Sequence, residues 1–197
     1  MHLLSIFLFS VSSNFDNLII GISYGIKKIR IPIISNLLIA FITFIGTALS
    51  MIFGKSLTAY IPIAVSNVIG AIMIIGIGIA GLIKYFHSKK NNQACESPSP
   101  LKNPEKYDKN TNNRIEFREA VSLGLALSIN NIGLGIGASI GGLHVLPAAI
   151  GSFVFSFIFI SIGDLLGNGL LSKIIGKYAE VIASFGIIGL GICELIF

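Results

Sequence analysis

Apolar residues fall into six long runs along the chain. The runs span residues 3–26, 33–54, 60–83, 117–140, 145–171 and 178–197. A membrane-spanning helix needs about 20 apolar residues at a rise of about 1.5 Å per residue, and every run reaches that length. The pattern therefore predicts an all-α integral membrane protein with six transmembrane helices.

The segment between the third and fourth runs has a different composition. It is rich in Asn, Lys, Ser and Pro and includes the sequence SPSPLKNPEKYDKNTNN. Such a segment cannot bury an apolar core, so we expect a solvated, flexible loop. The chain is thus predicted to divide into a first three-helix repeat (1–83), a flexible cytoplasmic loop (84–115) and a second three-helix repeat (116–197).

The distribution of charge predicts the orientation of the helices. Only 12% of the residues are charged, against about 25% in soluble domains. If all six runs span, thirteen of the fourteen Lys and Arg residues lie in the odd-numbered loops, which the positive-inside rule assigns to the cytoplasm. Both termini are then extracytoplasmic. Because the net charge of +5 lies in these loops, it indicates orientation and not nucleic-acid binding.

The two halves of the chain repeat one another. Residues 75–83 match residues 188–196 at an offset of 113, and at an offset of 114 three polar or small residues of the first run fall on the fourth. These residues are Asp16, Asn17 and Gly21, which fall on Asn130, Asn131 and Gly135. Three helices are an odd number, so the second repeat must enter the membrane inverted. Inverted repeats are typical of transporters, whose sites lie near the midplane.

Asp16 is the sharpest candidate for function because it is the only ionisable residue of residues 3–26. A charge at bilayer depth costs about 2.5–3.5 kcal/mol and requires a partner, a cavity or an ion. Together with Asn17, Asn130 and Asn131 it offers the oxygen ligands that Mg²⁺, Mn²⁺ or Ca²⁺ prefers. Alternatively, amides across a helix interface satisfy Asp16, and the asparagines are interhelical hydrogen-bond partners. A single central carboxylate provides little ligand charge for tight binding of a divalent cation.

Weaker candidates lie near this site or towards the cytoplasm. Ser12, Ser13 and Ser128 offer hydroxyl oxygens beside the two motifs. Asp164 lies in the inner half of the fifth run; it belongs to a cytoplasmic ion pathway, pairs with Lys173 or lies in water near the interface. No Ser/His/Asp, Cys/His or HExxH constellation is present, and the two cysteines form no metal-ligand spacing, so an enzyme is not expected.

The first run and the turn after it carry a family resemblance. The sequence VSSNFDNLIIGISYGIKKIRIP resembles the first helix of the sporulation membrane protein YtaF group, which is similar to the MntP manganese exporters of the LysE-like transporter superfamily. The resemblance covers all six runs. It implies a multi-pass protein of the bacterial inner membrane with one central acidic residue from each half. Asp16 occupies the first position, whereas Asn130 stands where the exporters carry Asp.

These observations together predict a divalent cation transporter of manganese type, in which one three-helix repeat rocks against the other. Two alternatives stay open: a non-transporting membrane scaffold of the sporulating cell, and an exporter of another small solute such as a lipid or an amino acid. No resident cofactor is expected, because Mn²⁺ or another divalent cation would be the cargo. The expected partners are the lipid bilayer and a small cation, with no nucleic acid, and a homo-oligomer is left open.

Overall fold

The structure is a computed structural model that describes residues 2–58, 108 and 112–167, together with isolated helical positions within 69–83 and 185–192. Its helices are α1 (His2–Ser12), α2 (Phe15–Ile26), α3 (Ile33–Thr58), α5 (Phe117–Ile140) and α6 (Val145–Gly167). The all-helical prediction is confirmed, since the described residues contain no strand beyond one isolated bridge. The third and sixth predicted runs lie largely outside the described residues.

The described helices are long and apolar enough for three membrane spans, or for four if the two arms of α5 count as one. The first span, Leu3–Ile26, is made of two helices, although the sequence predicts one uninterrupted run. The chain leaves the α-helical ladder at Ser13 and Asn14, where the Asn14 amide donates to the carbonyl of Val11, only three residues earlier. Serine and asparagine side chains compete for nearby backbone groups and so favour such breaks.

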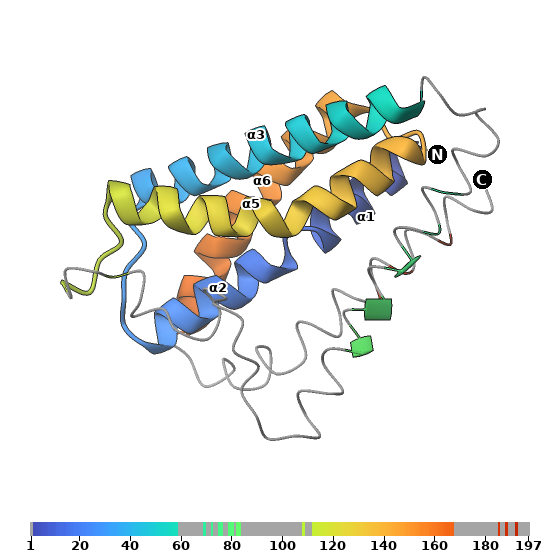
Figure 1. Cartoon of the computed structure of the whole chain (residues 1–197). Helices are drawn as coiled ribbons and strands as arrows, with labels where there is room; N and C mark the ends of the chain where they lie inside the picture. Colours follow the sequence, from blue (N-terminus) through green and yellow to red (C-terminus); the bar gives the residue numbers. More distant parts are fainter. Residues whose placement is uncertain are drawn as a thin grey trace.

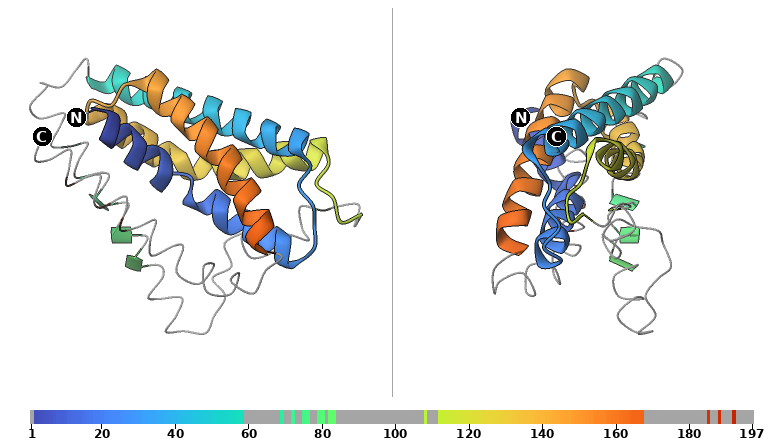
Figure 2. Two further views of the ribbon diagram at one scale, coloured as in Figure 1. Left: turned by 180° about the vertical axis from the view of Figure 1, so that it is seen from behind. Right: turned by 90° about the vertical axis from the view of Figure 1, so that its left-hand side faces the viewer.

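The helices form two parallel pairs, in which α1 and α2 together count as one broken helix. α3 lies alongside α5, and α1 and α2 lie alongside α6, which also contacts α3 (Figures 1 and 2). The contacts of small residues give the direction: Gly124 lies against Ile39 near the start of α3, and Gly54 lies against Ser139 near its end. Each pair therefore joins one helix of the first predicted repeat to one helix of the second.

Glycines set the close approach of α2 to α6. A Cβ atom on Gly21 would lie 2.5 Å from the carbonyl oxygen of Ile160, and one on Gly25 would lie 2.8 Å from the Cα of Gly167. On α6, a Cβ on Gly163 would lie 2.5 Å from the carbonyl oxygen of Leu18. Such distances leave no room for a side chain, so the two backbones touch directly. Small residues at this spacing are the usual means of packing helices in membranes.

The α3–α5 pair repeats this packing with serines in two of the four positions. Gly135 of α5 faces Ser50 of α3, and Ser139 of α5 faces Gly54 of α3. Gly135 and Ser139 follow Gly21 and Gly25 by 114 residues, which is the offset of the two polar motifs. Ser50 and Gly54 likewise precede Gly163 and Gly167 of α6 by 113 residues.

The chain before α5 is fixed to the turn between α2 and α3. Arg30 and Arg114 form a parallel bridge, in which the Arg30 amide donates to the Asn113 carbonyl and the Ile115 amide donates to the Arg30 carbonyl. The Ser35 hydroxyl of α3 donates to the Ile115 carbonyl at 2.7 Å. Asp108 is buried and accepts hydrogen bonds from the amides of residues 112 and 113. Asp108 and residues 112–115 belong to the segment 84–115, which the sequence predicts as a flexible loop. The described end of this segment is packed.

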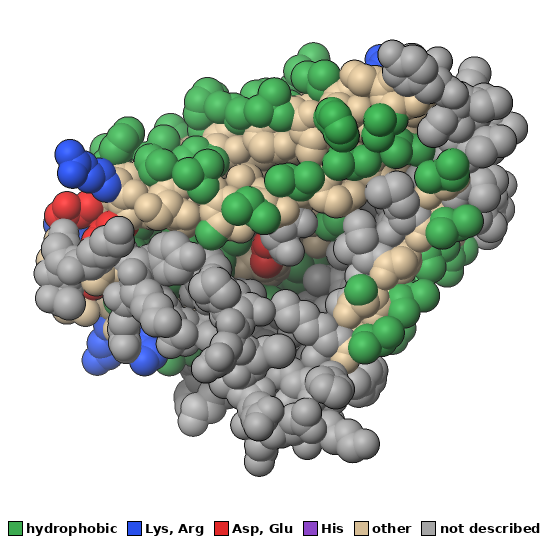
Figure 3. All heavy atoms as spheres, in the orientation of Figure 1, with side chains coloured by type: hydrophobic (Ala, Val, Ile, Leu, Met, Phe, Trp, Pro, Cys, Tyr) green, Lys and Arg blue, Asp and Glu red, His purple; other side chains and the backbone are tan. Residues whose placement is uncertain are grey.

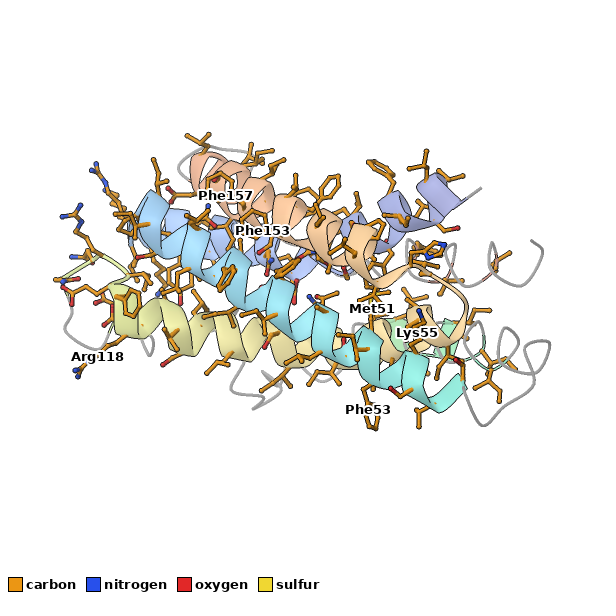
Figure 4. All side chains as sticks on the ribbon, turned by 90° about the horizontal axis from the view of Figure 1, so that it is seen from above. Met51, Phe53, Lys55, Arg118, Phe153 and Phe157 are labelled. Carbon is orange, nitrogen blue, oxygen red and sulfur yellow. The ribbon has the colours of Figure 1, made fainter. Side chains whose placement is uncertain are left out.

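Charged and hydrophobic side chains are segregated on the surface. In Figure 3, hydrophobic side chains predominate over the described part of the surface, whereas Lys, Arg, Asp and Glu gather mainly at one end, and one acidic group is visible near the middle. Figure 4 shows Arg118 at the charged end of α5, Lys55 at the far end of α3, and Phe53 pointing outwards. Large exposed hydrophobic residues along α3 and α6 are those expected of a surface in contact with lipid.

Candidate functional site

Asp16 lies at the start of α2, immediately after the break in the first span. Its side chain is half-buried, and its Oδ1 atom accepts a hydrogen bond of 2.9 Å from the amide of Asn17. The first turn of a helix carries partial positive charge, which favours a carboxylate there. The break in the span thus creates a helix N-terminus inside an apolar stretch, and Asp16 occupies it.

Behind Asp16, a buried set of polar side chains joins the break to α6. We call this set the α2–α6 polar cluster; it comprises Ser13, Asn14, Asn17, Ser152 and Ser156. The Asn14 amide group donates to the Ser10 carbonyl at 2.8 Å and to the Ser152 hydroxyl at 3.2 Å. The Asn17 amide group donates to Asn14 Oδ1 at 3.1 Å and to the Ser156 hydroxyl at 2.8 Å.

The second motif lies in α5, on the other helix pair. α5 bends by 44° between Phe117–Ile129 and Asn131–Ile140, so Asn130 stands at the bend. The side chain of Asn130 is outside the described set, whereas that of Asn131 is buried. The Ser128 hydroxyl donates to the carbonyl of Leu125 at 2.9 Å. The first and fourth predicted spans are therefore both interrupted close to their polar motifs.

Threonines of α3 accompany Asn131. Ser128 lies against Gly46 and Gly135 lies against Ser50, so Thr47 on α3 and Asn131 on α5 both lie between these two contacts. Both side chains are buried, as is that of Thr43. We call the set of Thr43, Thr47, Ser128 and Asn131 the α3–α5 polar cluster.

Buried oxygens without a hydrogen-bond partner occur in both clusters. They are Oδ1 of Asn17 in the α2–α6 cluster, and Oγ1 of Thr47 and Oδ1 of Asn131 in the α3–α5 cluster, counted over the described residues. Leaving a buried polar group unpaired costs about 1–3 kcal/mol, so such atoms are rare unless something else binds them. Asn17 and Asn131 are the pair that the internal repeat aligns, and their carbonyl oxygens share this property.

The structure brings the predicted site residues together within each half. Asn17 joins Ser13 through Asn14, and Asn131 lies near Ser128 on α5. Among the described side chains, no hydrogen bond joins the α2 motif to the α5 motif. The most extensive contacts between the halves run instead from α2 to α6 and from α3 to α5. A single four-residue site thus stays a prediction.

Asp164 lies apart from both clusters, towards the charged end. It follows Ser156 by eight residues on α6, which corresponds to about 12 Å along the axis. Together with Gly25, Lys28, Ile29 and Arg30 it lines a cavity of about 260 Å³. Its surroundings are therefore a basic turn, and not the amides of the polar clusters.

The donor set limits which ions could bind. Within the described part of the chain, no three His, Cys, Asp or Glu residues lie close enough to hold a metal ion together. Any ion at the polar clusters would be held mainly by amide, hydroxyl and backbone oxygens, with one carboxylate from Asp16. Such oxygens suit hard cations, and a low ligand charge weakens the affinity.

The sequence pattern did not indicate several of the polar residues at these interfaces. Ser152 and Ser156 are spaced i, i+4 on α6 and so share one helix face, which was the available signal. Asn36 of α3 donates to the Phe157 carbonyl at 3.0 Å and to the Ser161 hydroxyl at 2.8 Å, joining α3 to α6. Hydroxyl residues are common in membrane helices, so this spacing alone is a weak indication.

These features define an all-helical, multi-pass membrane protein with polar clusters buried between closely packed helices. The family model described as "Mntp: Putative manganese efflux pump" matches residues 98–195. "Probable sporulation protein YtaF" of Bacillus subtilis (strain 168) is 31% identical over 188 residues, covering 88% of this chain and 89% of that protein. The chain belongs to this family of YtaF- and MntP-like membrane proteins, which is not a family of enzymes.

A second relative matches a shorter stretch. "Putative manganese efflux pump MntP" of Corynebacterium glutamicum (strain R) is 31% identical over 78 residues, which is 40% of each chain. No solved structure matches the chain. The resemblance inferred from the first-helix motif and the basic turn is thereby confirmed.

Proposed function

We propose that this protein transports a divalent cation of manganese type across the cell membrane, using a midplane site formed by Asp16, Asn17, Asn130 and Asn131. The observation that carries the proposal is the pair of equivalent carbonyl oxygens, on Asn17 and Asn131, that are buried and have no hydrogen-bond donor among the described residues. A hard cation would satisfy both oxygens and the Asp16 carboxylate. The names of the matched family and of the C. glutamicum relative support manganese as the cargo.

The helix packing supports an inverted repeat of two three-helix units. If α1–α2 corresponds to α5 and α3 corresponds to α6, the α2–α6 contact becomes the α5–α3 contact when the repeats are exchanged. The small residues obey this exchange: Gly21 against Gly163 corresponds to Gly135 against Ser50. A pseudo-twofold axis would then pass between α3 and α6, which contact each other.

The same contacts suggest which parts move during transport. The sequence predicts that one repeat rocks against the other, but each close helix pair contains one helix of each repeat. Separating the repeats would break the glycine contacts of both pairs. We therefore propose that α3 and α5 move together against α1, α2 and α6, with the looser α3–α6 contact as the sliding surface.

The test is ⁵⁴Mn²⁺ movement in proteoliposomes containing wild-type protein, Asp16→Asn, Asn130→Asp or Glu116→Gln. Glu116→Gln makes the same carboxylate-to-amide change on an exposed side chain next to α5 and is the matched control. We expect the wild type and the control to move the ion and Asp16→Asn to slow it at least about tenfold, since a lost charge-assisted contact is worth about 1.5–3 kcal/mol. Asn130→Asp adds a carboxylate and should tighten binding.

Two results would contradict the proposal. Transport unchanged by Asp16→Asn would remove Asp16 from the site. Silence in all four proteins would contradict manganese transport and favour the second candidate, a non-transporting sporulation scaffold. That candidate is supported by the longer match, which is to a sporulation protein and not to an exporter. A scaffold should retain its phenotype with Asp16→Ala, provided that the membrane level of the protein is unchanged.

A further inference from the structure

The cavity at the charged end has a composition that transport of a cation does not require. It occupies about 260 Å³ between the end of α2, the turn after it and the last described part of α6. Among the described residues that line it, Lys28 and Arg30 are basic and Asp164 is acidic. These described side chains carry a net positive charge, which repels a divalent cation and attracts an anion.

The two basic residues are held on a well-defined turn. Lys28 has a φ of 59°, in the left-handed region, and its amide donates to the Gly25 carbonyl at 3.1 Å. The backbone of Arg30 is fixed on both sides by the bridge to Arg114. Both side chains are exposed, so the turn presents two cations to one cavity without burying either. Because the backbone of the turn is already fixed, ordering it adds no entropic cost when an anion binds.

Exposed aliphatic residues flank this cavity in the sequence. Ile26 precedes Lys28, Ile33 and Ile34 follow Arg30, and Leu165 follows Asp164, and half or more of each aliphatic side chain is exposed. These residues lie at the ends of α2, α3 and α6, where a membrane span meets the headgroup region. The junction therefore combines a cationic cavity with an apolar border, which matches the two parts of an acidic phospholipid.

We propose that this cavity binds the phosphodiester headgroup of an acidic phospholipid. Lys28 and Arg30 contact the phosphate oxygens, and the acyl chains lie over the exposed aliphatic side chains. Phosphatidylglycerol carries one negative charge, which is opposite in sign to the net charge of the described lining side chains. Basic pockets between helices at the cytoplasmic face are a known means of lipid headgroup recognition, and the basic residues assign this end of the bundle to that face.

The test measures the thermal unfolding temperature of the detergent-solubilised protein after addition of phosphatidylglycerol, phosphatidylcholine or inorganic phosphate. The variant is Lys28→Asn combined with Arg30→Gln; asparagine tolerates the left-handed conformation at residue 28, and the bridge at residue 30 uses only backbone atoms. The matched control is Lys55→Gln combined with Arg118→Gln, which removes the same charge from exposed positions outside the cavity.

We expect phosphatidylglycerol to raise the unfolding temperature of the wild type and of the control by roughly 3 °C or more. The shift should be absent in the cavity variant and smaller in high salt. Equal shifts in the cavity variant and the wild type, or no shift in either, would overturn the proposal. An equal shift with inorganic phosphate would show that the ligand is a soluble phosphate and not a lipid. An equal shift with phosphatidylcholine would show that the net charge of the lipid does not determine binding. Either result would overturn the proposal.

Discussion

The contact of α2 with α6 allows a sharp prediction about a single methyl group. In Gly163→Ala the new Cβ atom would lie 2.5 Å from the Leu18 carbonyl oxygen and 2.8 Å from the Gly21 Cα. Ordinary van der Waals contact begins at 3.4 Å, so the helices must separate by several tenths of an ångström. A gap of 0.5–1 Å forfeits about a quarter to a half of each dispersion contact along the interface.

Two opposing effects decide the size of the change. Overpacking of a close interface costs about 1–3 kcal/mol, whereas replacing glycine by alanine in a helix gains up to about 1 kcal/mol. We expect Gly163→Ala to lower the free energy of unfolding by about 1–2 kcal/mol. Gly76→Ala is the matched control, because no atom of the described residues lies within 4 Å of its added Cβ. It should be neutral or slightly stabilising.

The assay is reversible unfolding by sodium dodecyl sulfate in mixed micelles, followed by circular dichroism. Gly21→Ala should cost as much as Gly163→Ala, and the double variant should cost less than the sum, because both methyl groups push the same two helices apart. If Gly163→Ala and Gly76→Ala had the same free energy of unfolding, α2 and α6 would not be in backbone contact.

Three further changes test the polar contacts. Ser156→Ala removes the 2.8 Å hydrogen bond from Asn17 and should cost about 0.6 kcal/mol, the average for membrane interiors, in the same unfolding assay; a stabilised variant would show that the bond is not formed. Asp108→Ala deprives two backbone amides, including that of Asn113, of their acceptors, so their hydrogen exchange should accelerate, and unchanged exchange would contradict the packed loop end. Glu119→Ala breaks the capping box of α5 and should cost about 0.5–2 kcal/mol, whereas Glu119→Gln should retain most of it.

The sequence predicted the elements whose signal is long and periodic. The bounds of α5 agree with the run of residues 117–140, and α3 begins at Ile33 as predicted. It did not predict the break at Ser13 and Asn14, because hydropathy averages over about one span and two polar residues hardly change the mean. Hydropathy also could not predict the pairing of α2 with α6. A surface that faces lipid and one that faces another helix are equally apolar, and only the spacing of glycines distinguishes the two.

For the candidate site, the sequence identified the residues better than their surroundings. Asp16 stands out because ionisable residues are expensive in a membrane. The α6 residues that bind the neighbouring Asn14 and Asn17 are serines, which are ordinary in membrane helices and carry no such signal. The alignment of Asn17 with Asn131 came from the repeat, but side-chain positions were needed to find that neither carbonyl oxygen has a donor in the described part of the chain.

The exchange of partners between the halves has a consequence for biosynthesis. Over the described residues, the glycine surface of α2 and the Ser50–Gly54 surface of α3 contact helices that lie later in the chain. When the first half has been inserted and the second has not yet emerged from the ribosome, both surfaces remain against lipid. The first half is therefore an incomplete folding unit, and two separately expressed halves should reach their stable form only by assembling with one another.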